Sequence, residues 1–181
     1  MKLKTYVRIA ATLTTTGIVL VAFLVLLGEV PKTASADVAD LFVAPDGHGA
    51  CVQGDPCDLQ TALGLAGSGD TVYVAGGSYT GTGVAVVTIT ESISLLGGWS
   101  GAPVGEPMRD PVAYPSTLDG ERERRVIQII GDITPTVEGL IITRGDATLA
   151  PADPGRGGGI YVADASPTIA NNDINNNAGR P

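Results

Sequence analysis

The chain of 181 residues is acidic, with 19 Asp and Glu against 11 Lys and Arg and a formal net charge of −8 at pH 7. This charge disfavours nucleic acid and anionic lipid headgroups as partners. Aromatic residues make up only 4% of the sequence, which excludes a globular core built on large rings and favours a long, thin core of aliphatic side chains.

The first 36 residues have the layout of a secretory signal peptide. A basic head is followed by the nearly apolar run 17–28 and by the small-residue pattern Ala34-Ser35-Ala36, which predicts cleavage before Asp37. A retained N-terminal membrane anchor is the alternative, because the apolar run extends back to Ala10 through interspersed threonines. Both interpretations place the rest of the chain outside the cytoplasm, secreted or at the cell surface. Cleavage would leave 7 basic and 18 acidic residues, a charge of about −11 and no lysine.

Residues 37–69 are expected to form an N-terminal cap that is closed by a disulfide. Cys51 and Cys57 lie close together in a chain expected to be exported, which predicts a bond between them and a tight loop. His48 lies three residues before the first cysteine, so a metal site is a weaker alternative for this loop.

The same cap is predicted to contain one strand and one short helix. The strand runs from Asp40 to Pro45, and the helix is expected to begin at Asp55-Pro56 and to end before Gly67. Four residues share its apolar face, Leu59, Ala62, Leu63 and Ala66. A helix here would cover the open end of a stack of strands.

Residues 70–181 alternate short β-branched runs with Gly, Pro, Asp and Asn, which is typical of strands between turns. The predicted strands are 70–75, 84–90, 93–96, 117–120 and 126–130. Gly76-Gly77 is expected to turn the chain, and Tyr79 is expected to pack inside. Residues 100–115, which contain four prolines, are predicted to form a loop that bulges from the stack, and 121–125 to form a charged, exposed turn.

One segment repeats after 32 positions, because Asp132 to Ala147 returns as Asp164 to Gly179. The aligned pairs include Val137 with Ile169, Ile142 with Ile174, Ile129 with Tyr161, and Ile130 with Val162. A segment that recurs at a fixed spacing usually forms one supersecondary unit that stacks on its neighbour. The simplest unit without a helical period is a coil of parallel strands, each about 4.8 Å from the next.

Several segments resemble secreted right-handed parallel β-helix proteins of the pectate-lyase-like superfamily. Residues 41–47, 58–63 and 69–79 resemble the N-terminal part of those proteins, and 157–162 with 166–172 resemble their repeating rungs. The resemblance covers nearly all of residues 41–179. It implies an all-β fold, a right-handed parallel β-helix of about three to four coils with a small N-terminal helical cap. It implies no single reaction, because the superfamily includes pectate lyases, other polysaccharide-cleaving enzymes and adhesins.

Five asparagines gather near the C-terminal rung, Asn171, Asn172, Asn175, Asn176 and Asn177. An inward-facing asparagine at the corner of a coil is expected to bond to the backbone and to asparagine in the next coil. The alternative is a polar strip that contacts sugar.

The sequence favours a non-catalytic, exported module that binds polysaccharide or a cell-surface glycan, with an adhesion role. Trp99, at the base of the predicted loop, and Arg144, just after a rung strand, are the candidate ligand contacts. No catalytic, cofactor-binding or metal-binding residue is assigned. Residues 70–181 are expected to be an incomplete β-helix, with further coils in a longer chain, because 177–181 fall in the middle of a rung.

The alternative is a polysaccharide lyase or glycoside hydrolase. The resemblance implies that a lyase would use a Lys or Arg base with calcium held by clustered Asp, and calcium is expected only in that case. A hydrolase would need two carboxylates about 5–10 Å apart, for which Glu138 and Asp146 are the candidates.

Overall fold

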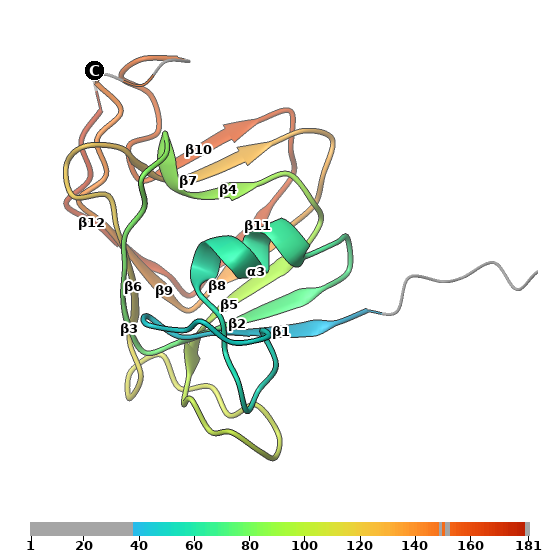
Figure 1. Cartoon of the computed structure of the whole chain (residues 1–181). Helices are drawn as coiled ribbons and strands as arrows, with labels where there is room; N and C mark the ends of the chain where they lie inside the picture. Colours follow the sequence, from blue (N-terminus) through green and yellow to red (C-terminus); the bar gives the residue numbers. More distant parts are fainter. Residues whose placement is uncertain (1–37, 149, 151–152, 180–181) are drawn as a thin grey trace, which may run out of the picture. The chain divides into compact units, whose positions relative to one another are not determined.

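The computed structural model describes residues 38–148, 150 and 153–179, and the predicted signal peptide lies outside them. Strands make up most of the regular structure there, and every ladder between them is parallel. They form three sheets with the orders β1-β2-β5-β8-β11, β12-β9-β6-β3 and β10-β7-β4, called here the first, second and third sheet (Figure 1).

The chain passes through the three sheets in turn, and one such passage is called a coil below. The first sheet contains β1 (Asp40–Val43), β2 (Thr71–Ala75), β5 (Ser94–Trp99), β8 (Thr136–Glu138) and β11 (Thr168–Ala170). The second contains β3 (Gly77–Tyr79), β6 (Ser116–Asp119), β9 (Leu140–Thr143) and β12 (Asp173–Asn175). The third contains β4 (Ala85–Ile89), β7 (Arg125–Ile130) and β10 (Ile160–Ala163).

The core is a column of aliphatic side chains between the sheets. Successive side chains of a strand point to opposite faces, so every second residue points inward. Val72, Leu95 and Val137 are partners in neighbouring strands of the first sheet, and all three are fully buried. Tyr79, predicted to pack inside, is buried over the second sheet, where its hydroxyl donates to the carbonyl of Ala75 at 2.9 Å.

The 32-residue repeat is confirmed in two of the sheets. Val137 pairs with Ile169, and Ile142 with Ile174, both in parallel register. In the third sheet the predicted alignment is wrong by one residue, because Ile129 pairs with Val162 rather than Tyr161. Ile130 correspondingly pairs with Ala163. The turn after β10 (164–167) is one residue shorter than the turn after β7 (131–135), so the spacing in the third sheet is 33.

Two residues predicted to lie in turns begin strands instead. In both cases the residues that bond to them are distant in the sequence. Gly77, read as part of a turn, begins β3, because it pairs in parallel with Ser116 of β6. Arg125, read as part of an exposed turn, begins β7 and is only 1% exposed. Its guanidinium group donates to the carbonyls of Asp153 (2.8 Å) and Arg156 (3.2 Å), which belong to the loop before β10.

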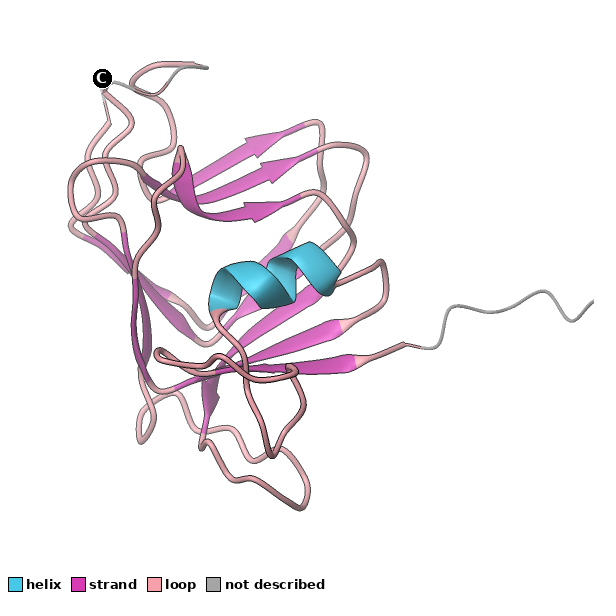
Figure 2. Ribbon diagram, viewed as in Figure 1, coloured by secondary structure: helices cyan, strands magenta, loops and turns pink. Residues whose placement is uncertain are grey.

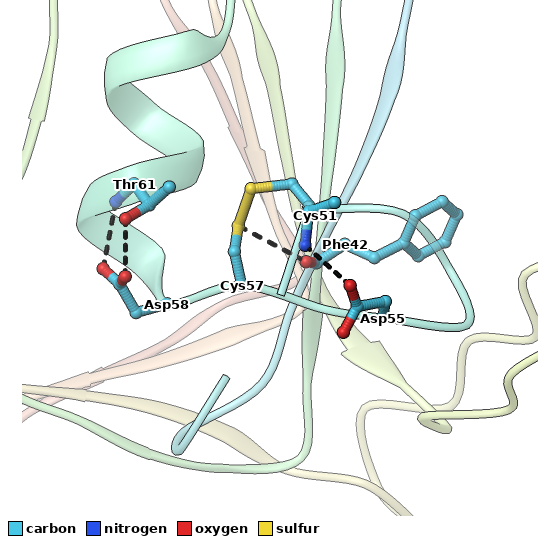
Figure 3. Close-up of a disulfide and its surroundings, with 7 residues drawn as sticks. Phe42, Cys51, Asp55, Cys57, Asp58 and Thr61 are labelled. Atoms are coloured by element: carbon cyan, nitrogen blue, oxygen red, sulfur yellow. Dashed lines mark hydrogen bonds between the residues drawn. A yellow bond between two sulfur atoms is a disulfide. The ribbon is translucent and has the colours of Figure 1, made fainter. Parts of the chain in front are cut away.

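The predicted disulfide is present, and its loop covers the outer edge of the first sheet (Figure 3). Cys51 and Cys57 are bonded, with their Cα atoms 4.5 Å apart. The amide of Phe42 donates to the carbonyl of Cys51 at 2.9 Å, and the amide of Cys57 donates to the carbonyl of Phe42 at 3.0 Å. The loop therefore satisfies backbone groups of β1 that an edge strand leaves unpaired.

The cap helix α3 (Leu59–Leu65) begins later than predicted. Asp58, not the Asp55-Pro56 pair, is the N-cap, and its carboxylate accepts the amide of Thr61 at 3.0 Å (Figure 3). The helix lies across the space between the sheets (Figure 2). The side-chain amide of Gln60 donates to the carbonyl of Val86 at 2.7 Å and so covers part of the free edge of β4.

Asp70 fastens the helix end to the first sheet. Its carboxylate accepts the amides of Ala39, before β1, and Gly67, after α3, both at 2.8 Å. The hydrogen bond from Ala39 and then that from Gly67 lower the pKa of Asp70, so the carboxylate is ionised at neutral pH.

Two asparagines close the corners of the preceding coil, as predicted. Asn172 donates to the carbonyl of Val137 and accepts the amide of Leu140, both at 2.9 Å. Asn177 repeats this arrangement on Ile142 and Gly145, at 2.8 and 2.7 Å. All five asparagines of the chain belong to one coil, so a bond to asparagine in the next coil stays a prediction. None of the helices in the described ranges is long and apolar enough to cross a membrane.

Candidate functional site on the outer face of the first sheet

Two registered rows of side chains lie on the outer face of the first sheet. One row consists of hydroxyl-bearing residues from four consecutive strands, Thr71, Ser94, Thr136 and Thr168. The other consists of Phe42, Tyr73, Leu96 and Glu138. Both rows cross the strands, so neighbouring members are separated by the distance between strands, about 4.8 Å.

The hydroxyl row is available to an external partner. None of its four hydroxyl groups is bonded to another described residue. Thr168 is exposed and the other three are half-buried, so all four residues keep surface that is exposed to solvent. A linear array of unpaired hydroxyl groups can donate and accept hydrogen bonds along a polymer that lies across the strands.

Aromatic rings border this row at the N-terminal end of the stack. Phe42 and Tyr73 stack with centroids 5.1 Å apart, and Phe42 meets Trp99 at 4.9 Å. Trp99 is only 1% exposed, and its indole N–H has no acceptor among the described residues. Tyr73 is half-buried and is the ring accessible from outside. The structure therefore places Trp99 beneath the surface as a packing residue, and the accessible ring of this face is Tyr73, which the sequence did not indicate.

The loop 100–115 lies outside the sheets, as predicted (Figure 1). It also brings one cation, Arg109, to the same face. Arg109 donates from Nε to the carbonyl of Gly97 at 3.0 Å, and its Nη2 lies 3.5 Å from Oε1 of Glu138. Burial, followed by the negative charge of Asp40, raises the pKa of Tyr73. Its phenol group therefore stays protonated at neutral pH and can donate a hydrogen bond to a ligand.

Arg144 is not on this face. It follows β9 of the second sheet and bonds through two nitrogens to Asp119, at 2.7 and 2.6 Å. Burial alone would raise the pKa of Asp119, but the hydrogen bonds from Arg144 and the amide of Glu121, with the charge of Arg144, lower it. The same hydrogen bond raises the pKa of Arg144, which opposes a role as a proton-abstracting base.

The two candidate carboxylates of a hydrolase do not form a pair. Glu138 precedes β9 and Asp146 follows it, and a strand of four residues spans about 13 Å. Hydrogen bonds from the backbone and side chain of Thr148 lower the pKa of Asp146, whereas a general acid needs a raised pKa. In the neighbouring charged turn, Arg124 pairs with both Glu121 and Glu123, so these carboxylates are already engaged.

The predicted metal alternative at His48 has no support in the geometry. His48 lines an open depression of about 520 Å³ with Asp46 and Asp55. The carboxylate of Asp55 is occupied by the amide of Ala50 at 3.0 Å. Within the described ranges no group of three or more His, Cys, Asp or Glu is arranged to hold a metal ion.

Comparison of the chain with protein-family models, curated proteins and solved structures finds no match. The geometry of the two rows is therefore the basis for a functional proposal.

Proposed function

We propose that the chain is a secreted or cell-surface module with a right-handed parallel β-helix, and that it binds a polysaccharide without cleaving it. The observation that carries this proposal is the row of four unpaired hydroxyl groups beside an accessible tyrosine on the outer face of the first sheet. The ligand would lie across the strands, along the direction of the stack.

The helical architecture is supported by the order in which the chain visits the sheets. Each coil enters the first sheet, continues in the second and closes in the third, and all ladders are parallel. Crossover connections between parallel strands are right-handed in almost all proteins, which gives the hand of the proposed β-helix.

Export is supported by the signal-peptide pattern of residues 1–36 and by the disulfide between Cys51 and Cys57. Disulfides persist in oxidising compartments and are rare in the cytosol. The two features are independent of each other.

A neutral polysaccharide fits the chemistry of the face better than a polyanion. The described residues of the face offer one cation, Arg109, and this cation is already paired with Glu138. The acidic surface of the exported part repels polyanions further. Hydroxyl groups and a tyrosine ring suit sugar, because sugars present hydroxyl groups at their edges and C–H groups on their faces.

The proposal is tested by depletion binding to neutral polysaccharides such as cellulose and xylan, with polygalacturonate as the acidic comparison. Thr136→Val removes one hydroxyl of the row, and losing one hydrogen bond of about 1 kcal/mol weakens binding about fivefold. Tyr73→Ala is expected to weaken it by about tenfold.

Thr117→Val is the matched control, because Thr117 is a half-buried threonine of the second sheet whose hydroxyl also has no protein partner. This variant is expected to bind like the unchanged protein. Equal losses of affinity in the Thr117 and Thr136 variants, or no retention on any polysaccharide, would refute the assignment of the binding site to the first sheet.

The alternative is a polysaccharide lyase or hydrolase, which would call for a second measurement on the same samples. Release of new reducing ends or of unsaturated products, with or without added calcium, would show that the protein is an enzyme and not only a binding module.

A further inference from the structure

A single ion pair lies beside the hydroxyl row on the outer face of the first sheet. Thr136 and Glu138 point outward from β8, because Val137 between them is fully buried. Residues two apart on one strand are separated by about 7 Å. Nη2 of Arg109 lies 3.5 Å from Oε1 of Glu138, and the two side chains are 21% and 34% exposed. A sugar that bonds to Thr136 therefore lies within reach of both charges.

Arg109 is held on this face by contacts that do not involve Glu138. Its Nε donates to the carbonyl of Gly97 at 3.0 Å, and its backbone forms an antiparallel bridge with Trp99 at the end of β5. The guanidinium group also packs against the corner after β8, where a Cβ atom on Gly139 would lie 3.0 Å from Nη2. Removal of the carboxylate of Glu138 therefore leaves the cation in place.

Glu138 alone decides whether this cation is neutralised. Among the described residues, Glu138 is the one carboxylate that forms an ion pair with Arg109. Asp40, the partner of Thr71 in β1, is the next carboxylate along the rows. It lies three strands from β8, a separation of about 14 Å. This separation exceeds the screening length of about 10 Å at 0.1 M salt.

We propose that Glu138 determines the specificity of the site, because it neutralises Arg109 and so excludes polysaccharides that are built from uronic acids. This inference rests on the proposed function. While Glu138 is present, a sugar carboxylate that approaches the face meets a like charge and a cation that is already paired. Without that carboxylate, the guanidinium group presents a fork of N–H donors that suits a sugar carboxylate.

The experiment is depletion binding of Glu138→Gln and Glu138→Ala to polygalacturonate and, on the same samples, to the neutral polysaccharides cellulose and xylan. Glutamine keeps the shape of the side chain, and alanine also removes the oxygen that glutamine could still offer to Arg109. Both variants are expected to bind polygalacturonate about tenfold more tightly than the unchanged protein, as one hydrogen bond between charged groups contributes. The gain is expected to shrink as salt is added, because binding a polyanion releases its counterions.

The matched control is Glu123→Gln. It removes the same charge from another Arg–Glu pair, in which Glu123 lies 2.7 Å from Arg124 in the turn after β6, away from the first sheet. This variant is expected to bind polygalacturonate no better than the unchanged protein. The double variant Glu138→Gln with Arg109→Gln is expected to lose the gain. Circular dichroism checks that each variant is folded.

No gain on polygalacturonate in either Glu138 variant, an equal gain in Glu123→Gln, or a gain that survives Arg109→Gln would each overturn the proposal. The two proposals fail in different ways. If the unchanged protein binds a neutral polysaccharide and the Glu138 variants show no gain, only the role of Glu138 is refuted. If the unchanged protein binds no neutral polysaccharide and the gain appears and depends on Arg109, the proposed function is refuted while the control of Arg109 by Glu138 stands.

Discussion

Asn172 offers the sharpest test of how the coils are held together. Its side chain joins the carbonyl of Val137 to the amide of Leu140 across the corner between β8 and β9. Both of these residues are at most 1% exposed, so water does not replace the asparagine easily. Asn172→Ala removes both hydrogen bonds and leaves the corner intact in every other contact.

The expected cost follows from these contacts. Two hydrogen bonds contribute about 1 kcal/mol each, and leaving the buried amide of Leu140 unpaired adds about 1 kcal/mol or more. We therefore expect Asn172→Ala to lower the free energy of unfolding by about 3 kcal/mol. For a domain of this size, that loss lowers the melting temperature by about 10 °C.

Urea denaturation measures this loss directly. Trp99 is the only tryptophan of the chain and is buried, so its fluorescence reports unfolding. Asn175→Ala is the matched control, because Asn175 is exposed and makes two side-chain bonds, to Thr143 and Asp173, at the surface. It is expected to cost about 0.5 kcal/mol or less. Equal costs for the two variants would refute the idea that buried corner bonds join successive coils.

Three further predictions concern the cap and the core. Replacing Cys51 and Cys57 by serine is expected to cost about 2 kcal/mol in urea denaturation, because the disulfide restricts a short loop in the unfolded chain, and an unchanged midpoint would contradict this. Tyr79→Phe is expected to cost about 1 kcal/mol, and since burial raises the pKa of Tyr79, alkaline titration of the folded protein is expected to leave one tyrosine un-ionised. Asp70→Asn is expected to destabilise the protein at pH 7. The folded pKa of Asp70 is lowered, so its contribution is present above the unfolded pKa of about 3.9 and is lost as the pH falls through the folded value. A deficit that does not shrink as the pH is lowered below the unfolded pKa would contradict that assignment.

The repeated stretch was enough to predict the pairing of Val137 with Ile169, because both follow a Pro-Thr pair at the same distance from a turn. The one-residue shift in the third sheet was not predictable, since Ile129 and Ile130 of β7 meet hydrophobic residues of β10 in either register. Only the shorter turn before β11 decides it. The burial of Arg125 was not predictable from the local sequence, because the carbonyl groups that accept its hydrogen bonds belong to residues about 30 positions later.

The candidate site could be predicted only in part. Trp99 and the loop 100–115 lie beside it, but the hydroxyl row was not visible in the sequence. Thr71, Ser94 and Thr136 are separated by 23 and 42 positions, because the coils differ in length. Unequal spacing conceals the row from any search for a fixed period, whereas strand pairing places the three residues side by side.

The unequal length of the coils has a practical consequence. The loop 100–115 enlarges one coil without disturbing the pairing of β5 with β8 on the same sheet. Foreign peptides of similar length could therefore be grafted between Ser100 and Met108, whose backbones already bond to each other at 3.0 Å. The protein would then serve as a rigid display scaffold, with the inserted sequence held beside an extended, regularly spaced surface.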